Sequence, residues 1–466
     1  MAGKQTKSKS SDLSSPAPSL GGALAGAVVT TAGMDAMYSL GSSMGHDMFG
    51  ELATIGTLEQ APEDPVQAFR EAALGNFVGM VDEAHCLALL GVMTPAQLGE
   101  VAGDAGLLGL IGSAFNPAEL RAAAEIGGAV LGAKLFEQRF QIPMKGRYEH
   151  TGEHRGGQQS SNSDIRDAER DNDGEVLIEW EHQDILDVWD ILATLPAHDV
   201  SENSVITAFE SISGNRGFWG VSEARRGNGE IQLGQGLNDA SPDRIEHTVR
   251  HEIGHAVHDL LRASVDAWLS AGVGFKVLGR GRDGCEALVN ALGGFPDPST
   301  SDKEHLLDLL EAHLNRTQWV SGDPIPEDDS DWQQMNPAVK MAVQTSSPAW
   351  YTNYGQHPSG EGGRVFFNHY YHNTMVFSPV AEAAIDATGD DYSAMSPMEF
   401  FANCYAEYFS DPAGYSDSSK WGGGLPASVK AFFKAHILER QPYQAPVEAG
   451  TINPELTTNN RSGVPH

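Results

Sequence analysis

The chain has 466 residues, of which 40% are hydrophobic, so it is long enough for two or three domains with packed cores. Its 63 aspartates and glutamates, set against 30 lysines and arginines, give a formal net charge of -33. A field of this sign repels phosphate backbones and argues against a nucleic-acid partner. The three cysteines are odd in number and far apart, which predicts buried thiols and no disulfide framework: Cys86, Cys285 and Cys404.

The N-terminal part of the sequence predicts a helical domain that follows a polar leader. Residues 1–19 are rich in Ser, Lys and Pro, and we expect them to be disordered. Residues 20–144 are rich in Ala, Gly, Leu and Met and carry few strand signals. The apolar run Leu20–Val29 is too short and too weakly hydrophobic for a membrane span, so membrane contact is not expected. Three segments have helical spacing and a suitable first residue: Pro65–Leu74, Pro95–Val101 and Pro117–Phe140.

The same region contains one pattern that is typical of serine hydrolases. Gly41–Gly45 fits G-x-S-x-G, with Ser43 in the place of the nucleophile. This motif requires a strand before it and a helix after it. Met34–Leu40 does not have the pattern of a core strand, so an ordinary Gly/Ser loop is the favoured interpretation.

A polar segment then separates the helical region from a second globular one. Residues 145–175 have neither helical nor strand periodicity over most of their length and predict a linker. Residues 176–440 have globular patterning, and residues 441–466 form a C-terminal tail. Within the globular part we expect strands at Phe218–Val221 and Glu230–Leu233, and helices with long irregular segments over residues 262–390.

One predicted helix carries a metal-binding pattern, H-E-I-G-H, at His251–His255. Ser241 suits the N-cap of this helix and Pro242 its first position. Residues four apart stand on one face of a helix, so His251 and His255 can bind one metal ion. Glu252 then lies beside the metal, where it can accept a proton from a bound water. An apolar stripe marks a different, buried face: Ile245, Val249, Ile253, Ala256 and Leu260.

A catalytic zinc usually has three protein ligands and one open position. The metzincin spacing would require histidine at Leu261, so that subclass is excluded. A second predicted helix, Ser396–Phe409, places three polar side chains on one face: Glu399, Asn403 and Glu407. We expect Glu399 to be the third ligand, with Glu407 as one alternative. Glu382 is another alternative, because Asp386 follows it at the E-x-x-x-D spacing.

These two segments together resemble the glutamate zincins, and in particular the anthrax-lethal-factor-like metallopeptidases. H-E-I-G-H-A-V-H-D at His251–Asp259 looks like the metal helix of that family, and E-F-F-A at Glu399–Ala402 looks like its third-ligand helix. The family also places a tyrosine seven residues before the ligand glutamate, which is Tyr392 here. The segment from Arg364 to Ser378 resembles the part of the family that precedes it, and the likeness covers residues 176–440. The family usually has glutamate four residues after the ligand, whereas this chain has Asn403.

The resemblance implies an α+β zincin-like catalytic domain, made of a small mixed sheet, an active-site helix and a helical C-terminal lobe, behind the mainly helical N-terminal domain. It implies one catalytic Zn²⁺, Glu252 as the base and Tyr392 as the oxyanion donor. Asp259, Asn403 or Glu407 would orient the ligands, and the strand around Ile231–Leu233 would pair with an extended substrate.

The expected function is therefore a zinc metalloendopeptidase that acts on a protein or peptide. A secreted toxin or delivered effector, whose N-terminal region would engage secretion or packaging machinery, is the hypothesis that the family adds. The alternative expectation is that the protein is soluble and located in the cytoplasm. The second hypothesis for function is a decayed zincin fold that binds without catalysis, and Asn403 is its main support.

Overall fold

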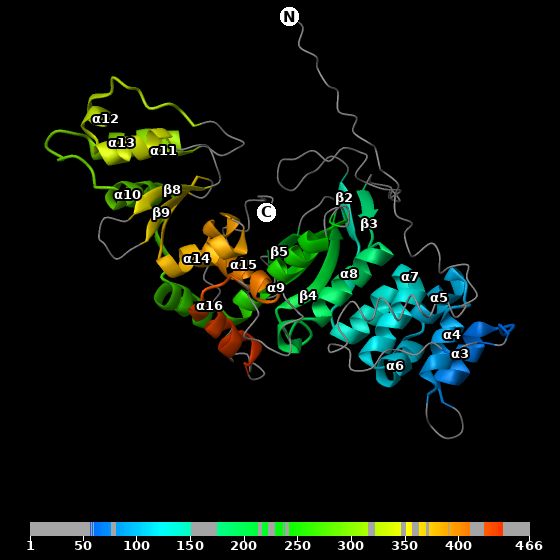
Figure 1. Cartoon of the computed structure of the whole chain (residues 1–466). Coiled ribbons are helices and arrows are strands. Elements are labelled where there is room, and N and C mark those ends of the chain that lie inside the picture. The colour runs from blue at the N-terminus through cyan, green and yellow to red at the C-terminus, as the bar shows by residue number, and fades with distance from the viewer. Residues whose placement is uncertain are drawn as a thin grey trace, which may run out of the picture. The chain divides into compact units, whose positions relative to one another are not determined.

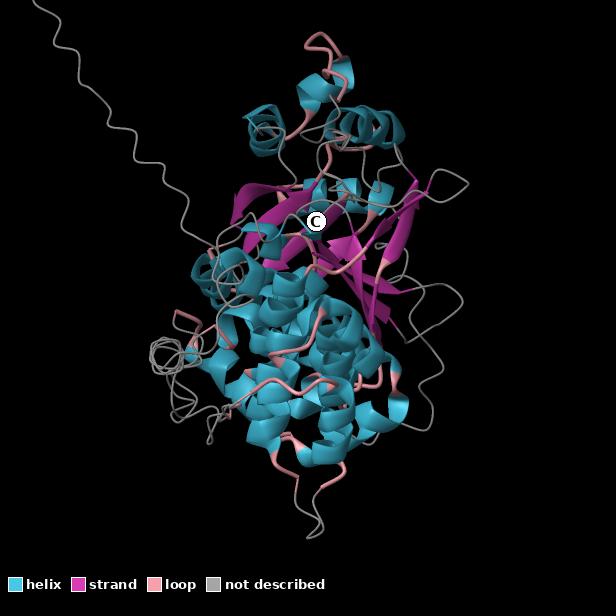
Figure 2. Cartoon of the chain, turned by 90° about the vertical axis from the view of Figure 1, so that its right-hand side faces the viewer, coloured by secondary structure: helices cyan, strands magenta, loops and turns pink. Residues whose placement is uncertain are grey.

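The computed structural model describes residues 56, 58, 60–75, 81–150, 175–212, 217–221, 229–235, 237, 242–315, 322–345, 351–356, 363–369, 372–389, 391–410 and 424–440. The leader, the Leu20–Val29 run, the Ser43 motif, Ser241 and the C-terminal tail lie outside these residues. Figure 2 shows that helices form most of the described chain and that the strands gather in small sheets, which confirms the predicted α+β class. No helix in the described part of the chain combines the length and apolar character that crossing a bilayer requires.

The N-terminal region is helical, as predicted, and its helices begin where side chains cap them. Asp64, Asp82, Thr94, Asp104 and Asn116 each accept a hydrogen bond from a backbone N–H in the first turn of the helix that follows. The helices are α3 (Pro65–Ala73), α4 (Glu83–Leu90), α5 (Pro95–Gly103), α6 (Ala105–Ala114) and α7 (Pro117–Phe140) (Figure 1).

These helices share a hydrophobic core with the main sheet and the helices that pack on it. Phe136 on α7 makes edge-on ring contacts with Trp189 on α8 (His182–Ala193) and with Phe209 on strand β4 (Ile206–Ile212). Aromatic pairs of this kind are among the more strongly stabilising contacts in a core. The helical region therefore packs directly on the sheet.

The segment predicted as a linker has strands at both of its ends. Strand β2 (Arg147–His150) pairs antiparallel with β3 (Glu175–Ile178), and residues 151–174 between them lie outside the described part. Just before them, β1 (Met144–Lys145) joins the main sheet beside β4. Periodicity did not reveal these strands because each is only two to four residues long.

The main sheet has the strand order β1-β4-β6-β5. Strands β1, β4 and β6 (Gly229–Gly234) run parallel, and β5 (Gly217–Val221) is antiparallel to β6. Both edges of β6 are thus occupied, so the expectation that Ile231–Leu233 pairs with substrate is wrong. Strand β5 is the outermost strand of the described sheet on that side.

The motif helix, α9 (Pro242–Ala267), contacts β5, β6 and α8. Its predicted apolar face is confirmed, because Val249, Ile253 and Ala256 are fully buried. The helix continues as a π-helical turn, Trp268–Val273 (η3), and stops at Gly274, whose φ of 74° is a left-handed conformation that favours glycine.

The segment between α9 and residue 378 forms a lobe with its own hydrophobic core, around Leu306, Leu310 and Trp332. The expectation of helices with long irregular segments missed its sheet, which has the order β7-β10-β9-β8 and is antiparallel throughout. The strands are β7 (Lys276–Gly279), β8 (Tyr351–Gln356), β9 (Arg364–Asn368) and β10 (Asn373–Phe377). The helices are α10 (Gly281–Ala291), α11 (Lys303–Leu314), α12 (Ser330–Gln334) and α13 (Pro337–Thr345).

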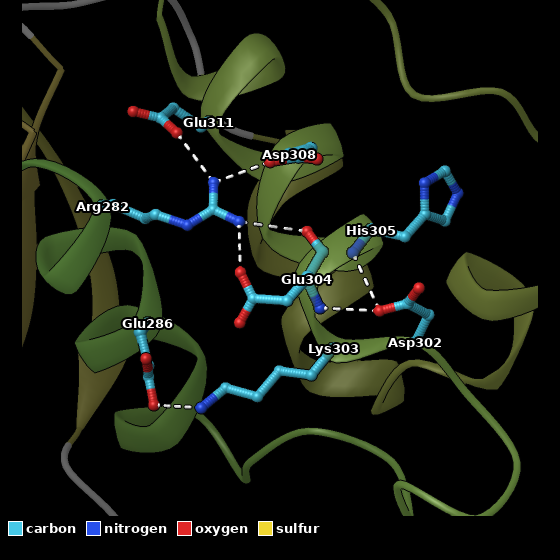
Figure 3. A network of polar contacts seen from close by, with 8 residues as sticks. All are labelled: Arg282, Glu286, Asp302, Lys303, Glu304, His305, Asp308 and Glu311. Atoms are coloured by element: carbon cyan, nitrogen blue, oxygen red, sulfur yellow. Dashed lines mark hydrogen bonds and ion pairs between the residues drawn. The ribbon is translucent and has the colours of Figure 1, made fainter.

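Ion pairs join α10 to α11 on the surface of this lobe. The guanidinium of Arg282 contacts three carboxylates of α11, from Glu304, Asp308 and Glu311, at 2.7–3.1 Å (Figure 3). Lys303 pairs with Glu286 beside them. All of these groups are substantially exposed, so the network contributes only modestly to the stability of the contact between the two helices.

The chain then returns to the motif helix through α14 (Pro379–Thr388), the short helix η4 (Asp391–Ala394) and α15 (Pro397–Tyr408). The last described elements are α16 (Ala427–Phe432) and a π-helical turn, Phe433–Leu438 (η6). Arg440, just after this turn, forms a buried ion pair of 2.7 Å with Asp199 of η1 (Ala197–Asp199). The hydroxyl of Tyr405 on α15 donates to the same carboxylate, so this network anchors α15 from behind.

Candidate metal centre

The site is built on a close contact between α9 and α15, which Figure 1 shows side by side. The contact passes through Gly254, inside the H-E-I-G-H pattern. A Cβ atom at this position would lie 2.9 Å from Ala402 Cα and 3.0 Å from Tyr405 Cβ, well inside ordinary van der Waals distance. Glycine therefore allows α15 to approach the histidine-bearing face of α9.

Helix α15 begins as the sequence predicts, and the cap at its start fixes the position of Glu399. Ser396 accepts a hydrogen bond from the backbone N–H of Glu399, and Pro397 occupies the first helical position. Glu399 is thus held in the first turn, and it is 4% exposed.

Three ligand atoms meet between the two helices. Oε2 of Glu399 lies 3.0 Å from Nε2 of His251 and 3.2 Å from Nε2 of His255, and the two Nε2 atoms are 3.0 Å apart. All three side chains are buried. Of the predicted candidates for third ligand, the structure brings Glu399 to the histidines.

This group of atoms fits a zinc ion. Two imidazoles and one carboxylate form a ligand set of catalytic zinc sites. Bonds of about 2.0–2.1 Å in tetrahedral geometry separate neighbouring ligand atoms by about 3.3 Å, close to the spacing found here. A further buried carboxylate oxygen, Oε2 of Glu252, has no hydrogen-bond partner among the described residues, as expected of a group that faces a reactant.

The two buried carboxylates have pKa values that are shifted in opposite directions. Burial raises the pKa of Glu252 to about 8; the neighbouring Glu399 adds to the rise and His251 opposes it. Burial also opposes ionisation of Glu399, but His255 and His251 outweigh it and lower its pKa to about 2. Glu399 is therefore ionised, as binding a metal requires, while in the metal-free site Glu252 holds its proton more tightly than an exposed carboxyl group does.

Glu252 is held against strand β5. A Cβ atom on Gly217 would lie 2.5 Å from Thr248 Cγ2 and 3.0 Å from Glu252 Oε1. The first residue of β5 must therefore be small for Glu252 to keep its position.

Asn403 takes the place where the family usually has glutamate, and it contacts the site. Its Oδ1 accepts a hydrogen bond of 2.8 Å from His251 Nδ1 and one of 3.0 Å from His247 Nε2. A hydrogen bond to the outer nitrogen of a ligand histidine fixes the orientation of the ring. The amide carbonyl thus makes the contact that the missing carboxylate was expected to provide.

Two further predicted site residues, Tyr392 and Asp259, lie outside the group of three ligand atoms. The ring of Tyr392 on η4 is 6.4 Å from that of His251, centroid to centroid. Asp259 lies one turn after His255 on α9, where it forms an ion pair of 3.3 Å with Arg262 and lies 3.8 Å from His258 Nδ1.

The two alternative ligands are engaged elsewhere or remote from the centre. Glu382, at the start of α14, accepts a hydrogen bond of 2.8 Å from the backbone N–H of Arg364. Glu407 is two turns along α15 from Glu399 and is partly exposed. His247 and Ser393 were not among the predicted site residues, although the i−4 spacing of His247 from His251 was a signal for the first.

The fold and this arrangement of side chains support a zincin-type metallopeptidase, which is a hydrolase of peptide bonds. Residues 179–270 match the family described as dual-action HEIGH metallo-peptidase, and the letters of that name stand at His251–His255. The matched segment includes the main sheet from β4 onward and α9, and it ends before Glu399. No curated protein and no solved structure matches the chain significantly.

Proposed function

We propose that this protein is a zinc-dependent metalloendopeptidase in which His251, His255 and Glu399 bind one zinc ion. The observation that carries the proposal is the convergence of three buried ligand atoms, from two helices far apart in the sequence, within 3.2 Å of one another. Glu252, a buried carboxylate with a raised pKa, lies one residue from the first ligand.

A zinc ion held by His251, His255 and Glu399 would supply Lewis-acid chemistry for the carbonyl group and for a bound water near neutral pH. Glu252 accepts a proton from the attacking water and passes it to the leaving amine. Its position suits both transfers, because the carboxyl group is buried directly beside the first ligand and its Oε2 has no hydrogen-bond partner among the described residues. Tyr392 would donate a hydrogen bond to the oxyanion.

Strand β5 is the natural place for an extended substrate. It pairs with β6 on one side, and no described strand pairs with its other edge. A peptide that added to this edge would gain main-chain hydrogen bonds. Because Gly217 of β5 lies against Glu252, the peptide would run beside the base.

The decayed-enzyme hypothesis loses its main support, since Asn403 makes the hydrogen bond to His251 on which the doubt rested. The lethal-factor-like subclass and the role of secreted toxin or effector have only the sequence resemblance behind them. They are not needed to explain the site.

The test compares the purified protein with Glu252→Gln, using zinc content and cleavage of unfolded casein as the two measurements. We expect about one zinc per chain in both proteins and a fall in cleavage of about 10²–10⁴-fold in the variant. Glu399→Gln should lose the zinc, whereas Glu407→Gln, the matched change on the same helix, should keep it. Zinc-free wild-type protein, or a Glu252→Gln variant of unchanged activity, would refute the proposal.

A further inference from the structure

A chain of hydrogen-bonded polar side chains leads from the metal-binding face of α9 to the end of α14. His247 and His251 both donate to Oδ1 of Asn403, and Nδ2 of Asn403 donates to Ser393 Oγ at 2.9 Å. Ser393 Oγ lies 3.1 Å from Thr388 Oγ1. Both Asn403 and Ser393 are fully buried.

The chemistry of an amide satisfies each of these contacts. Oδ1 has two lone pairs, and the two histidines use both. Nδ2 is a donor and faces the serine hydroxyl. An ionised glutamate would offer acceptors only. The three contacts together fix which way the amide points.

This geometry links two parts of the site that are separate in the sequence. His251 is a ligand in the proposed centre, and Ser393 directly follows Tyr392 on η4. The η4 turn is closed by a hydrogen bond of 2.9 Å from the backbone N–H of Met395 to the carbonyl of Tyr392. One side chain, Asn403, therefore holds both the ring of His251 and the turn that carries Tyr392.

We infer that His247, Asn403 and Ser393 form a positioning unit that orients the ligand histidine through the carbonyl of Asn403 and the tyrosine turn through its amide group. The inference rests on the proposed function and deepens it. Two residues without an assigned role, His247 and Ser393, thereby become positioning residues. The two halves of the unit should be separable by mutation, because each uses a different atom of Asn403.

The first experiment measures zinc affinity by competition with a chelator, and kcat and KM on a fluorogenic peptide. Asn403→Leu removes both halves, and zinc affinity should fall by about 10–100-fold. Asn403→Asp keeps an acceptor for the histidines and should restore most of that affinity. His247→Leu should weaken zinc binding less than Asn403→Leu does.

Ser393→Ala removes the amide's partner alone. Its zinc affinity should equal that of the wild type while kcat falls and KM stays unchanged, since the turn that carries Tyr392 is loosened. A purely structural role would lower the melting temperature of the variants without this split. Unchanged zinc affinity in Asn403→Leu, or an equal loss of affinity in Ser393→Ala, would overturn the inference.

A second measurement does not depend on zinc or on activity. In metal-free protein labelled with ¹⁵N-histidine, NMR should find protons on Nδ1 of His251 and on Nε2 of His247. An unprotonated Nδ1 on His251 would refute the unit. A wild type that binds no zinc but shows these protons would refute the proposed function and leave the hydrogen-bonded unit standing.

Discussion

Gly254 offers the most direct test of the contact that forms the site, through its replacement by alanine. The new Cβ would meet Ala402 Cα at 2.9 Å and Tyr405 Cβ at 3.0 Å. Carbon atoms in favourable contact are about 3.5–4.0 Å apart. Since both neighbours belong to α15, that helix would have to move by about 0.5–1 Å away from α9.

The displacement should lower both the stability of the fold and the affinity for zinc. Overpacking of this size costs about 1–3 kcal/mol, and alanine returns about 1 kcal/mol of helix propensity. The net loss of folding free energy should therefore be at most about 2 kcal/mol. Glu399 moves with α15, and metal–ligand distances tolerate only about 0.2 Å. We expect zinc affinity to fall about tenfold or more, which is about 1.4 kcal/mol.

The assay is chelator competition for zinc, with urea unfolding of the metal-free protein measured in parallel. Gly109→Ala on α6 is the matched control, because a Cβ there meets no atom within 4 Å. The control should bind zinc as the wild type does and gain up to about 1 kcal/mol in stability. If Gly254→Ala also binds zinc with wild-type affinity, the close contact between α9 and α15 does not set the metal site.

Three further predictions concern the base and the buried charges. Gly217→Ala should lower kcat while zinc content stays at one per chain, because the added methyl group displaces Glu252; unchanged kcat would contradict the contact. Arg440→Met should reduce the free energy of unfolding in urea by about 3–5 kcal/mol, since it leaves the carboxylate of Asp199 buried without its cation. The exposed control Arg282→Met should cost only about 1 kcal/mol, and equal losses would contradict the reasoning. In metal-free protein, Glu252 holds a proton up to a pKa of about 8, whereas the unfolded chain releases it near 4.5, so the free energy of unfolding should fall as pH rises between these values. Glu252→Gln should remove that decline, and an unchanged pH profile would show that Glu252 is not buried as described.

Local patterns predicted the parts of the site that lie within single helices. The i, i+4 spacing of His251 and His255 and the Ser396 cap of α15 depend only on neighbours in sequence, and both appear in the structure as expected. Helix α7 has the predicted bounds because Asn116 caps its start through side-chain and backbone bonds of the first turn.

Contacts between distant segments could not be read from the sequence in the same way. Strand β6 has a pattern that suits an edge or an inner strand, and only its partners β4 and β5 show that it is inner. The role of Asn403 depends on two histidines more than 150 residues away in the sequence. No pattern among its sequence neighbours shows that its carbonyl accepts hydrogen bonds from them. The antiparallel sheet of the lobe was missed because its strands are only four to six residues long and β7 lies far from the other three in the sequence.

The central claim is that two histidines and one glutamate hold a catalytic zinc, and X-ray absorption at the zinc edge of the purified protein tests it most directly. We predict a shell of nitrogen and oxygen atoms only, at about 2.0–2.2 Å, with an imidazole signal from two histidines that is reduced in His255→Ala. A sulfur shell at about 2.3 Å, or a spectrum that His255→Ala leaves unchanged, would place the zinc elsewhere and contradict the account.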